Sequence, residues 1–295
     1  MTVVGVVGLG SMGGEIAGRL IAAGHEVHGT NRTRGDRAKA LIARGLTWHD
    51  TPREVAGAVE VVISMVTDDV ALNAVAGGPD GILAGLSPST VYVDMSSVSQ
   101  TASVSLADQV RSIGSHMLDA PVSGSVPQVQ AGSLAIMVGG EEATFDQVEP
   151  LLAQLGRTVT RVGDNGAGVL LKLAINISLA VQVLAFSEGL LLAQSGGLDP
   201  RLAADVMGNS PIGSPMLKTR IPLLLDLPDD AWFTIQLMHK DIRLALAEAH
   251  RAAVALPSAA VAGAVLSRAE ELGYGGQDIA GLREVLGKIS EQAVE

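Results

Sequence analysis

Lys172 and Asn176 stand four residues apart inside residues 168–184, a segment whose other side chains are almost all apolar. On an α-helix these two positions share a face, so an ammonium and an amide would project in the same direction. A lysine in apolar surroundings can exchange a proton, because burial favours the neutral amine over the ammonium. The alternative is an ordinary lysine at a helix end whose charged tip reaches solvent. The elements around this segment decide between the two interpretations.

A glycine-rich turn at the N-terminus forms a second set of candidate residues. Residues 3–7 are β-rich, and Gly8-Leu-Gly-Ser-Met-Gly13 separates them from a helical stretch over 15–23. In G-x-G-x-x-G the glycines allow a tight turn, close approach of a pyrophosphate and close helix–strand packing, and the helix N-terminus faces the phosphates. This placement favours a dinucleotide site over a glycine-rich turn without a ligand. The expected cofactor contacts are Gly8, Leu9, Gly10, Ser11, Met12 and Gly13.

The end of the second predicted strand indicates which cofactor is used. An NAD site usually has an acidic residue here for the ribose 2′-hydroxyl, but this strand ends in Gly29-Thr-Asn-Arg-Thr33. Arg32 offers a planar donor fork for a 2′-phosphate, and Asn31 and Thr33 add hydrogen-bonding groups. The alternative is that Arg32 is a solvated loop residue. We expect NADP(H) in preference to NADH.

Composition excludes several other classes of function. A formal net charge of −11 and few aromatic residues (two Trp, two Tyr, three Phe) make nucleic-acid binding a poor fit. Cysteine is absent, which excludes disulfides and thiolate chemistry and suits a reducing compartment, so we expect the cytoplasm. The N-terminus has no basic region or cleavage site, and we predict no signal peptide.

The apolar segment is short for a membrane span. Fifteen uncharged residues separate Lys172 from Glu188, whereas a bilayer needs about 20. Asn176, Gln182 and Ser187 interrupt the run further. We therefore expect a buried helix of a soluble protein and no membrane partner.

Hydrophobic periodicity divides the chain in two. Up to about residue 163, β-rich runs alternate with helical stretches, which is typical of a parallel sheet wrapped by helices. The candidate strands are residues 3–7, 26–30, 59–66, 90–94, 116–119, 134–138 and 158–162. Thr51-Pro-Arg-Glu54 predicts a helix start with a capping box. After about residue 165 only helical periods remain.

The predicted architecture is therefore α/β. Residues 1–163 form a Rossmann-type doubly wound NADP-binding domain, and residues 164–295 form an all-α domain for substrate binding and dimerisation. A long interdomain helix joins them. Because that helix is apolar on nearly every side, we expect a second subunit to cover part of it, in a homodimer or homotetramer.

Four further motifs, taken with the glycine turn, resemble the β-hydroxyacid dehydrogenase family, which includes 3-hydroxyisobutyrate dehydrogenases and glyoxylate/succinic semialdehyde reductases. The motifs are Asp94-Met-Ser-Ser97, Asp119-Ala-Pro-Val-Ser-Gly-Ser125, Gly166-Ala-Gly-Val-Leu-Leu-Lys172 with Asn176, and Phe233-Thr-Ile-Gln-Leu-Met-His-Lys-Asp241. They occur in the family's order and span nearly the whole chain. Asn31-Arg-Thr33 is similar to the family's NADP-preferring branch.

The resemblance implies a hydride transfer between a nicotinamide and a small β-hydroxyacid, semialdehyde or 2-oxo acid. Lys172 would be the general acid and base, and Asn176 would orient the lysine or the substrate oxygen. Ser123 and Gly124 would hold the substrate's acid group, and Ser97 would lie beside substrate and nicotinamide. Lys240 would reach the nicotinamide end and attract an acidic substrate as a second cation. Met65, Val66 and Thr67 complete the expected cofactor contacts.

Departures from the family's pattern cluster at the substrate end. Ser125 and Gln128 stand in place of glycines, Val129 in place of alanine, and Ile175 where a second asparagine is common. We expect the first three to narrow or polarise the pocket. Selectivity is expected in residues 122–129 and 209–218. Asp278 falls where the family has a cofactor-side aspartate, and a helix N-cap explains it equally well.

Three other functions are alternatives from the sequence. An imine reductase shares the architecture but generally lacks a lysine at position 172. A 6-phosphogluconate dehydrogenase fits less well, because Ile175 replaces its histidine and the chain is short. A non-catalytic NADP-binding scaffold would be expected to lose Lys172, which this chain keeps. His239 has no metal-ligand spacing with the other five histidines, and no metal is expected.

Overall fold

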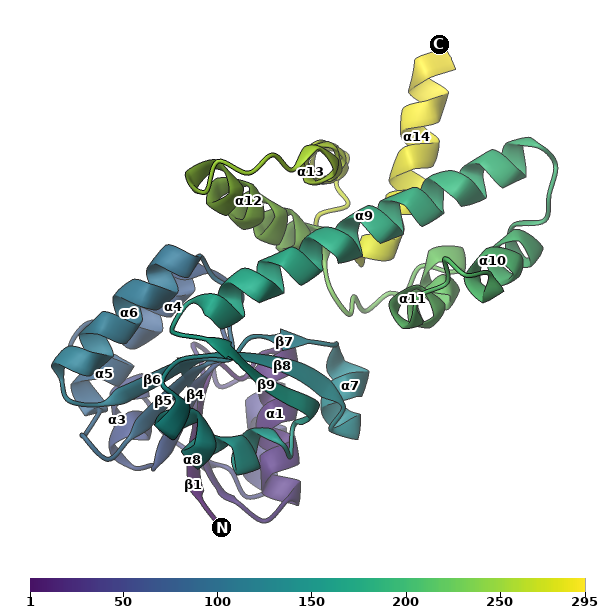
Figure 1. Cartoon of the computed structure of the whole chain (residues 1–295). Coiled ribbons are helices and arrows are strands. Elements are labelled where there is room, and N and C mark those ends of the chain that lie inside the picture. The colour runs from purple at the N-terminus through teal and green to yellow at the C-terminus, as the bar shows by residue number, and fades with distance from the viewer. Residues whose placement is uncertain (295) are drawn as a thin grey trace. The chain divides into compact units, whose positions relative to one another are not determined.

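The structure, a computed structural model, describes residues 1–294 and the side chains of residues 1–291. The chain folds into two compact units, Met1–Lys172 and Leu173–Glu295. The first is an α/β unit and the second is helical (Figure 1), which confirms the predicted fold class. The division falls inside the long helix α9 (Ala167–Ser195), so both units contain part of this helix.

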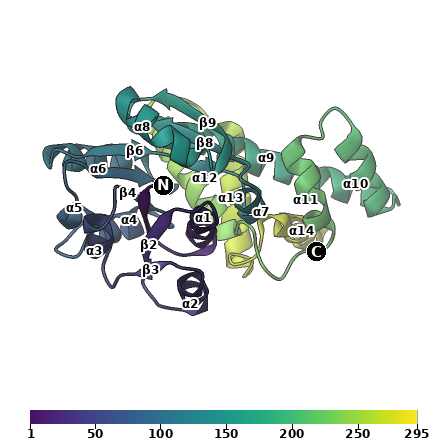
Figure 2. The same ribbon diagram turned by 90° about the horizontal axis from the view of Figure 1, so that it is seen from below.

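The α/β unit is built on one sheet with the order β3-β2-β1-β4-β5-β6-β8-β7, and β9 pairs with β8. The first six strands are mutually parallel in the Rossmann order, and β8 runs antiparallel to β6. Figure 2 shows β2, β3 and α2 together at one edge of this unit. The strands are β1 (Val3–Val7), β2 (Glu26–Thr30), β3 (Thr47–Trp48), β4 (Val61–Ser64), β5 (Val91–Asp94), β6 (His116–Asp119), β7 (Val122–Ser123), β8 (Leu134–Gly139) and β9 (Gly156–Gly163).

Alternating strand residues give the sheet two apolar faces. Ile63 and Val93 belong to a core shared with α1, α2, α7 and α8, whereas Val62 and Tyr92 point to the other face. Figure 1 shows α3, α5 and α6 gathered on that other side. The helices are α1 (Ser11–Ala22), α2 (Asp36–Ala43), α3 (Pro52–Gly57), α4 (Asp69–Ala76), α5 (Ile82–Gly85), α6 (Gln100–Ser112), α7 (Val126–Ala131) and α8 (Glu142–Leu152).

The helical unit has a separate core. Its buried side chains come from every one of its larger helices and include Phe186, Leu217, Met238 and Leu266. Pro200 and Pro257 each occupy a first helical position, where a proline's missing N–H costs no hydrogen bond. After α9, its elements are α10 (Pro200–Asn209), α11 (Pro215–Leu225), α12 (Ile235–Arg251), α13 (Pro257–Glu271), the 3₁₀ turn η1 (Ile279–Gly281) and α14 (Leu282–Val294).

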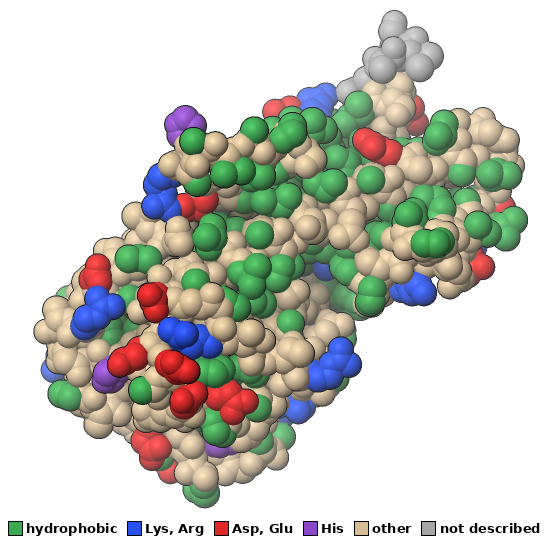
Figure 3. Space-filling model, viewed as in Figure 1, with side chains coloured by type: hydrophobic (Ala, Val, Ile, Leu, Met, Phe, Trp, Pro, Cys, Tyr) green, Lys and Arg blue, Asp and Glu red, His purple; other side chains and the backbone are tan. Residues whose placement is uncertain are grey.

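α9 is long and apolar enough to meet the length and composition test for a membrane span, and 39% of its most apolar window is buried. Core helices of soluble proteins meet the same test. Lys172 and Asn176 are both buried within it. Figure 3 shows hydrophobic side chains over much of the visible face of the helical unit, whereas charged side chains gather over the α/β unit.

Candidate active site

The glycine turn follows β1 at the point where the strand order reverses, between β1 and β4. Gly8 has φ +96°, and a Cβ on it would lie 2.4 Å from the Met65 carbonyl oxygen. A Cβ on Gly13 would lie 1.9 Å from the Gly8 carbonyl oxygen, whereas one on Gly10 would meet no atom within 4 Å. The open space beside Gly10 and the uncapped start of α1 fit a pyrophosphate.

The end of β2 is tied to this turn. The Asn31 side chain accepts a hydrogen bond from the Leu9 N–H at 3.2 Å and donates to the Thr33 carbonyl at 3.3 Å. Arg32 is exposed, so its guanidinium is accessible to a 2′-phosphate. Arg37, which the sequence analysis missed, donates to Ser11 Oγ at 3.1 Å and lies over the first turn of α1. Arg37 lies in the amphipathic helix α2, and the sequence of that helix did not indicate a contact with α1.

Asp94 organises the loops that follow β4 and β5. Its Oδ1 accepts hydrogen bonds from Ser64 Oγ and Ser96 Oγ, each at 2.6 Å. Ser96 Oγ in turn accepts the Val66 N–H at 3.0 Å, which fixes the loop predicted to contact the cofactor. Burial raises the pKa of Asp94 to about 6, against the opposing effect of the hydroxyl donors. Ser97, next in the chain, is half-buried at the same sheet edge.

The segment after β6 contains the short strand β7 and the turn that follows it. Ser123, the last residue of β7, is half-buried, and Gly124 in the turn is exposed. Gly124 has φ +135°, and a Cβ there would lie 2.7 Å from Leu134 Cδ2. Ser125 is the N-cap of α7, and its N–H donates to Gln128 Oε1 at 2.8 Å. Two of the departures from the family pattern therefore bind each other, and the third, Val129, is a fully buried core residue.

Asp119 holds the start of the helix that carries Lys172. It is fully buried at the end of β6, where its Oδ1 accepts the Gly166 N–H at 2.7 Å and its Oδ2 accepts the Val169 N–H at 2.9 Å. Desolvation raises the pKa of Asp119, and these backbone donors oppose that rise. A carboxylate here also complements the positive end of the helix. Lys172, one turn further on, is only 9% exposed.

In the helical unit, Asn176 has a defined orientation. It is 1% exposed, and its Nδ2 donates to Asp241 Oδ2 at 2.5 Å. Its Oδ1 is buried and has no hydrogen-bond partner among the described residues. Lys240 Nζ lies 2.6 Å from Asp241 Oδ1, so this predicted second cation has its own counter-ion. The carboxylate offsets the charge that was expected to attract an acidic substrate.

Asp278 has a structural environment. It is fully buried, pairs with Arg220 at 2.9 Å and accepts the N–H groups of Trp232 and Phe233. It also caps η1 by accepting the Ala280 N–H at 3.0 Å. The helix-cap interpretation of Asp278 is confirmed, and every one of these contacts lies within the helical unit.

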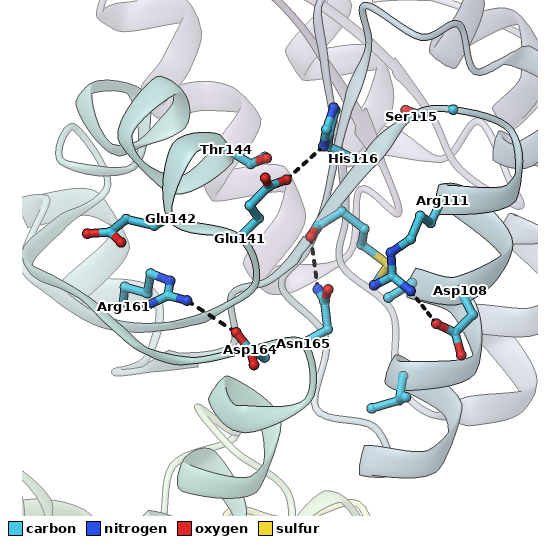
Figure 4. A pocket seen from close by; sticks show the side chains of 14 residues that line it. Asp108, Arg111, Ser115, His116, Glu141, Glu142, Thr144, Arg161, Asp164 and Asn165 are labelled. Atoms are coloured by element: carbon cyan, nitrogen blue, oxygen red, sulfur yellow. Dashed lines mark hydrogen bonds and ion pairs between the residues drawn. The ribbon is translucent and has the colours of Figure 1, made fainter.

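A separate hollow of about 660 Å³ lies at the start of β6 in the α/β unit (Figure 4). Its lining contains none of the predicted site residues. Three ionisable pairs lie at its rim: His116–Glu141, Arg161–Asp164 and Arg111–Asp108. Within residues 1–294, no group of three or more side chains is arranged to hold a metal ion.

Comparisons with known proteins agree with this arrangement. Residues 3–163 match the family described as the NAD binding domain of 6-phosphogluconate dehydrogenase, and residues 166–286 match the NAD-binding family of NADP-dependent 3-hydroxyisobutyrate dehydrogenase. The 2-hydroxy-3-oxopropionate reductase of Escherichia coli is 38% identical over 87% of this chain and 87% of its own.

Two solved structures are similar over nearly their whole length. The 3-hydroxyisobutyrate dehydrogenase of Mycobacterium tuberculosis with L-serine is 28% identical, covers 97% of this chain and 99% of its own, and has a TM-score of 0.84. Psf3 in complex with NADP⁺ and 2-OPP is 26% identical, covers 96% and 99%, and has a TM-score of 0.88. These findings support a pyridine-nucleotide-binding hydroxyacid or semialdehyde dehydrogenase, and the chain belongs to the β-hydroxyacid dehydrogenase family.

Proposed function

We propose that this protein is an NADPH-dependent reductase that converts a small aldehyde or keto acid to the hydroxyacid, reversibly in principle. When bound, the nicotinamide supplies or accepts the hydride. The observation that carries the proposal is the burial of Lys172 on a helix whose first N–H groups are fixed by Asp119. A proton donor held this way loses little orientation entropy in the reaction.

Lys172 Nζ gives a proton to the carbonyl oxygen during reduction and takes it back during oxidation. Asn176 supports it with a buried amide oxygen that has no hydrogen-bond partner among the described residues. An amide oxygen can only accept a hydrogen bond, so this atom suits a lysine N–H or the hydroxyl of the reduced product. Asn176 and Lys240 belong to the helical unit, and their assignment rests on the family's motifs.

The substrate's acid group is assigned to the loop that follows β6. Ser123 and Gly124 lie beyond the carboxyl end of that strand, where ligands of open α/β sheets bind. Ser97 stands at the same edge, after β5. A carbonyl acid held at one end by these groups would present its carbonyl to Lys172.

The preference for NADPH rests on Arg32. It is exposed at the end of β2, in a segment that offers no acidic side chain for a ribose 2′-hydroxyl. Arg32→Ala should raise the Kd for NADP⁺ at least tenfold and leave the Kd for NAD⁺ within twofold. Equal affinity of the wild type for both cofactors, unchanged by the substitution, would contradict the preference.

The test of the reaction is oxidation of NADPH with a panel of carbonyl compounds. The panel contains glyoxylate, succinic semialdehyde and methylmalonate semialdehyde, with 3-hydroxyisobutyrate for the reverse direction and cyclic imines for an imine reductase. Lys172→Ala should reduce kcat at least a hundredfold. A loss below tenfold, or about 1.4 kcal/mol of barrier, would exclude the general-acid role. Lys288→Ala, which removes an exposed lysine, is the matched control.

We also propose that the protein is a homodimer or homotetramer. Large apolar side chains of the helical unit are exposed, including Leu192 at 75%, Ile212 at 63% and Val206 at 61%. An apolar surface of this kind is typical of a subunit interface. Light scattering coupled to size exclusion should give a mass of at least twice 30.2 kDa, and a monomer would exclude the assembly.

A further inference from the structure

The side chain of Gln128 makes two contacts with the loop that is assigned to the substrate's acid group. It is the third residue of α7, and its side chain folds back so that Oε1 accepts the Ser125 N–H at 2.8 Å. The side chain also packs against the loop itself, since a Cβ on Gly124 would lie 3.0 Å from Gln128 Cβ. Gln128 therefore lies against the backbone of both Gly124 and Ser125.

The hydrogen bond between the Ser125 N–H and Gln128 Oε1 changes which N–H groups the loop can donate to a substrate. A glycine at position 128, as in the family's pattern, has no side-chain oxygen to accept the N–H of residue 125. Here that N–H is already bound to Gln128 Oε1. The other end of the same planar amide, Nε2, carries two N–H groups, and no described residue accepts a hydrogen bond from them. Gln128 is only partly buried, so these donors are accessible.

We propose that Gln128 is a substrate-specificity residue whose Nε2 donates to the carboxylate of the substrate in place of the Ser125 N–H. The inference rests on the proposed function, because it needs a carbonyl acid to be bound at residues 123–125. It names the preferred class of substrate as carbonyl compounds with a carboxylate. Uncharged carbonyl compounds gain less from this amide donor.

The competing explanation is that Gln128 only caps α7. Glutamate separates the two roles because it is also a capping-box residue, so its carboxylate can accept the Ser125 N–H. Glutamate has no N–H to donate, and its charge repels a carboxylate. Gln128→Glu therefore keeps the cap and loses the proposed substrate contact. Gln128→Gly loses both the cap and the side-chain donor but frees the Ser125 N–H.

The experiment measures kcat and KM with NADPH for the best carbonyl acid of the panel and for its methyl ester. Gln128→Glu should raise KM for the acid at least tenfold. For the ester, both kcat and KM should stay within twofold of wild type. Gln128→Gly should raise KM for the acid by a smaller factor, because a backbone donor returns. If Gln128→Glu does not fold, Gln128→Met, whose side chain has no N–H to donate, should raise KM for the acid and leave KM for the ester within twofold of wild type.

The outcomes distinguish this inference from the proposed function. An unchanged KM for the acid in Gln128→Glu, with an active wild type, overturns the substrate contact and leaves only a helix cap. An equal rise in KM for acid and ester also overturns it, because the effect would then be a general distortion of the loop. A wild type that reduces no member of the panel overturns the proposed function itself.

Discussion

Asp94 and Asp119 invite comparison because they end the neighbouring strands β5 and β6, are paired in register and are both fully buried. Their partners differ. Asp94 accepts from the hydroxyls of Ser64 and Ser96, and its Oδ2 has no hydrogen-bond partner among the described residues. Asp119 accepts backbone N–H groups with both oxygens.

The difference shows two uses of a buried carboxyl at the binding edge of a sheet. Burial raises the pKa of each group, most clearly for Asp94, where the pKa is about 6. Asp119 joins a strand to the helix that carries Lys172, so it determines where that helix begins. Asp94 joins the loops that follow β4 and β5 through the Ser96 hydroxyl, so it determines the conformation of the loop at Val66. One aspartate supports a helix and the other supports loops.

Removal of Asp119 should have the largest effect. Asp119→Ala leaves the N–H groups of Gly166 and Val169 buried without their acceptor, which should cost about 4 kcal/mol of unfolding free energy. Urea denaturation measures this loss. Asp119→Asn keeps one acceptor oxygen and should lose about half as much. A loss below about 1 kcal/mol in Asp119→Ala would show that the helix start does not depend on this carboxylate.

Ser96→Ala tests the loop side of the comparison. The Val66 N–H loses its acceptor and Asp94 loses a donor, so we expect a loss of about 2 kcal/mol in urea denaturation. Ser103→Ala is a matched control, because the Ser103 hydroxyl is equally buried but has no hydrogen-bond partner among the described residues. Its removal should change stability little. Equal effects of the two substitutions would exclude a supporting role for the Ser96 hydroxyl.

Asp94→Asn tests the titration of the buried carboxyl. A pKa raised from 3.8 to about 6 means that the native state holds this proton more tightly than the unfolded chain does. The stabilisation is therefore complete below about pH 4 and is lost as the pH rises through about 6, in total about 3 kcal/mol. Between pH 5 and pH 8 the stability of the wild type should fall by about 1.4 kcal/mol relative to Asp94→Asn.

Urea denaturation of both proteins across this pH range provides the measurement. Groups that titrate equally in the two proteins, including the histidines, cancel in the difference. If the stability difference is independent of pH, Asp94 does not titrate in this range. The two carboxyls would then differ in their partners only.

Features with a local sequence signal were predictable. The capping box at Thr51 and Glu54 forms as expected. Strand ranges were less accurate: the run over 59–66 yields only Val61–Ser64, and the two-residue strands β3 and β7 were missed because so short a segment has no periodicity. The pairing of Ser125 with Gln128 had a readable signal, since S-x-x-Q is a capping-box spacing.

Pairings between distant residues could not be predicted. Asp119 and Gly166 are 47 residues apart, and Arg220 and Asp278 are 58 apart. Motif spacing says nothing about which buried groups will meet when strand and helix pack together. The fold and the glycine turn therefore followed from the sequence, whereas the groups that hold Lys172 and the loops in place required the structure.

Thr51→Ala should have the smallest effect. It tests how much the burial of a capping group adds to the stability of a helix start. Thr51 caps α3 through its own side chain, which accepts the Glu54 N–H at 3.2 Å near the surface, whereas Asp119 caps α9 from a buried strand. Because water can replace the lost acceptor, we expect a cost of about 1 kcal/mol in urea denaturation and unchanged turnover. Thr51→Ser keeps the hydroxyl and should match the wild type. If Thr51→Ala costs as much as Asp119→Ala, capping alone explains both sites, and the buried position of Asp119 adds nothing to the stability of the helix start.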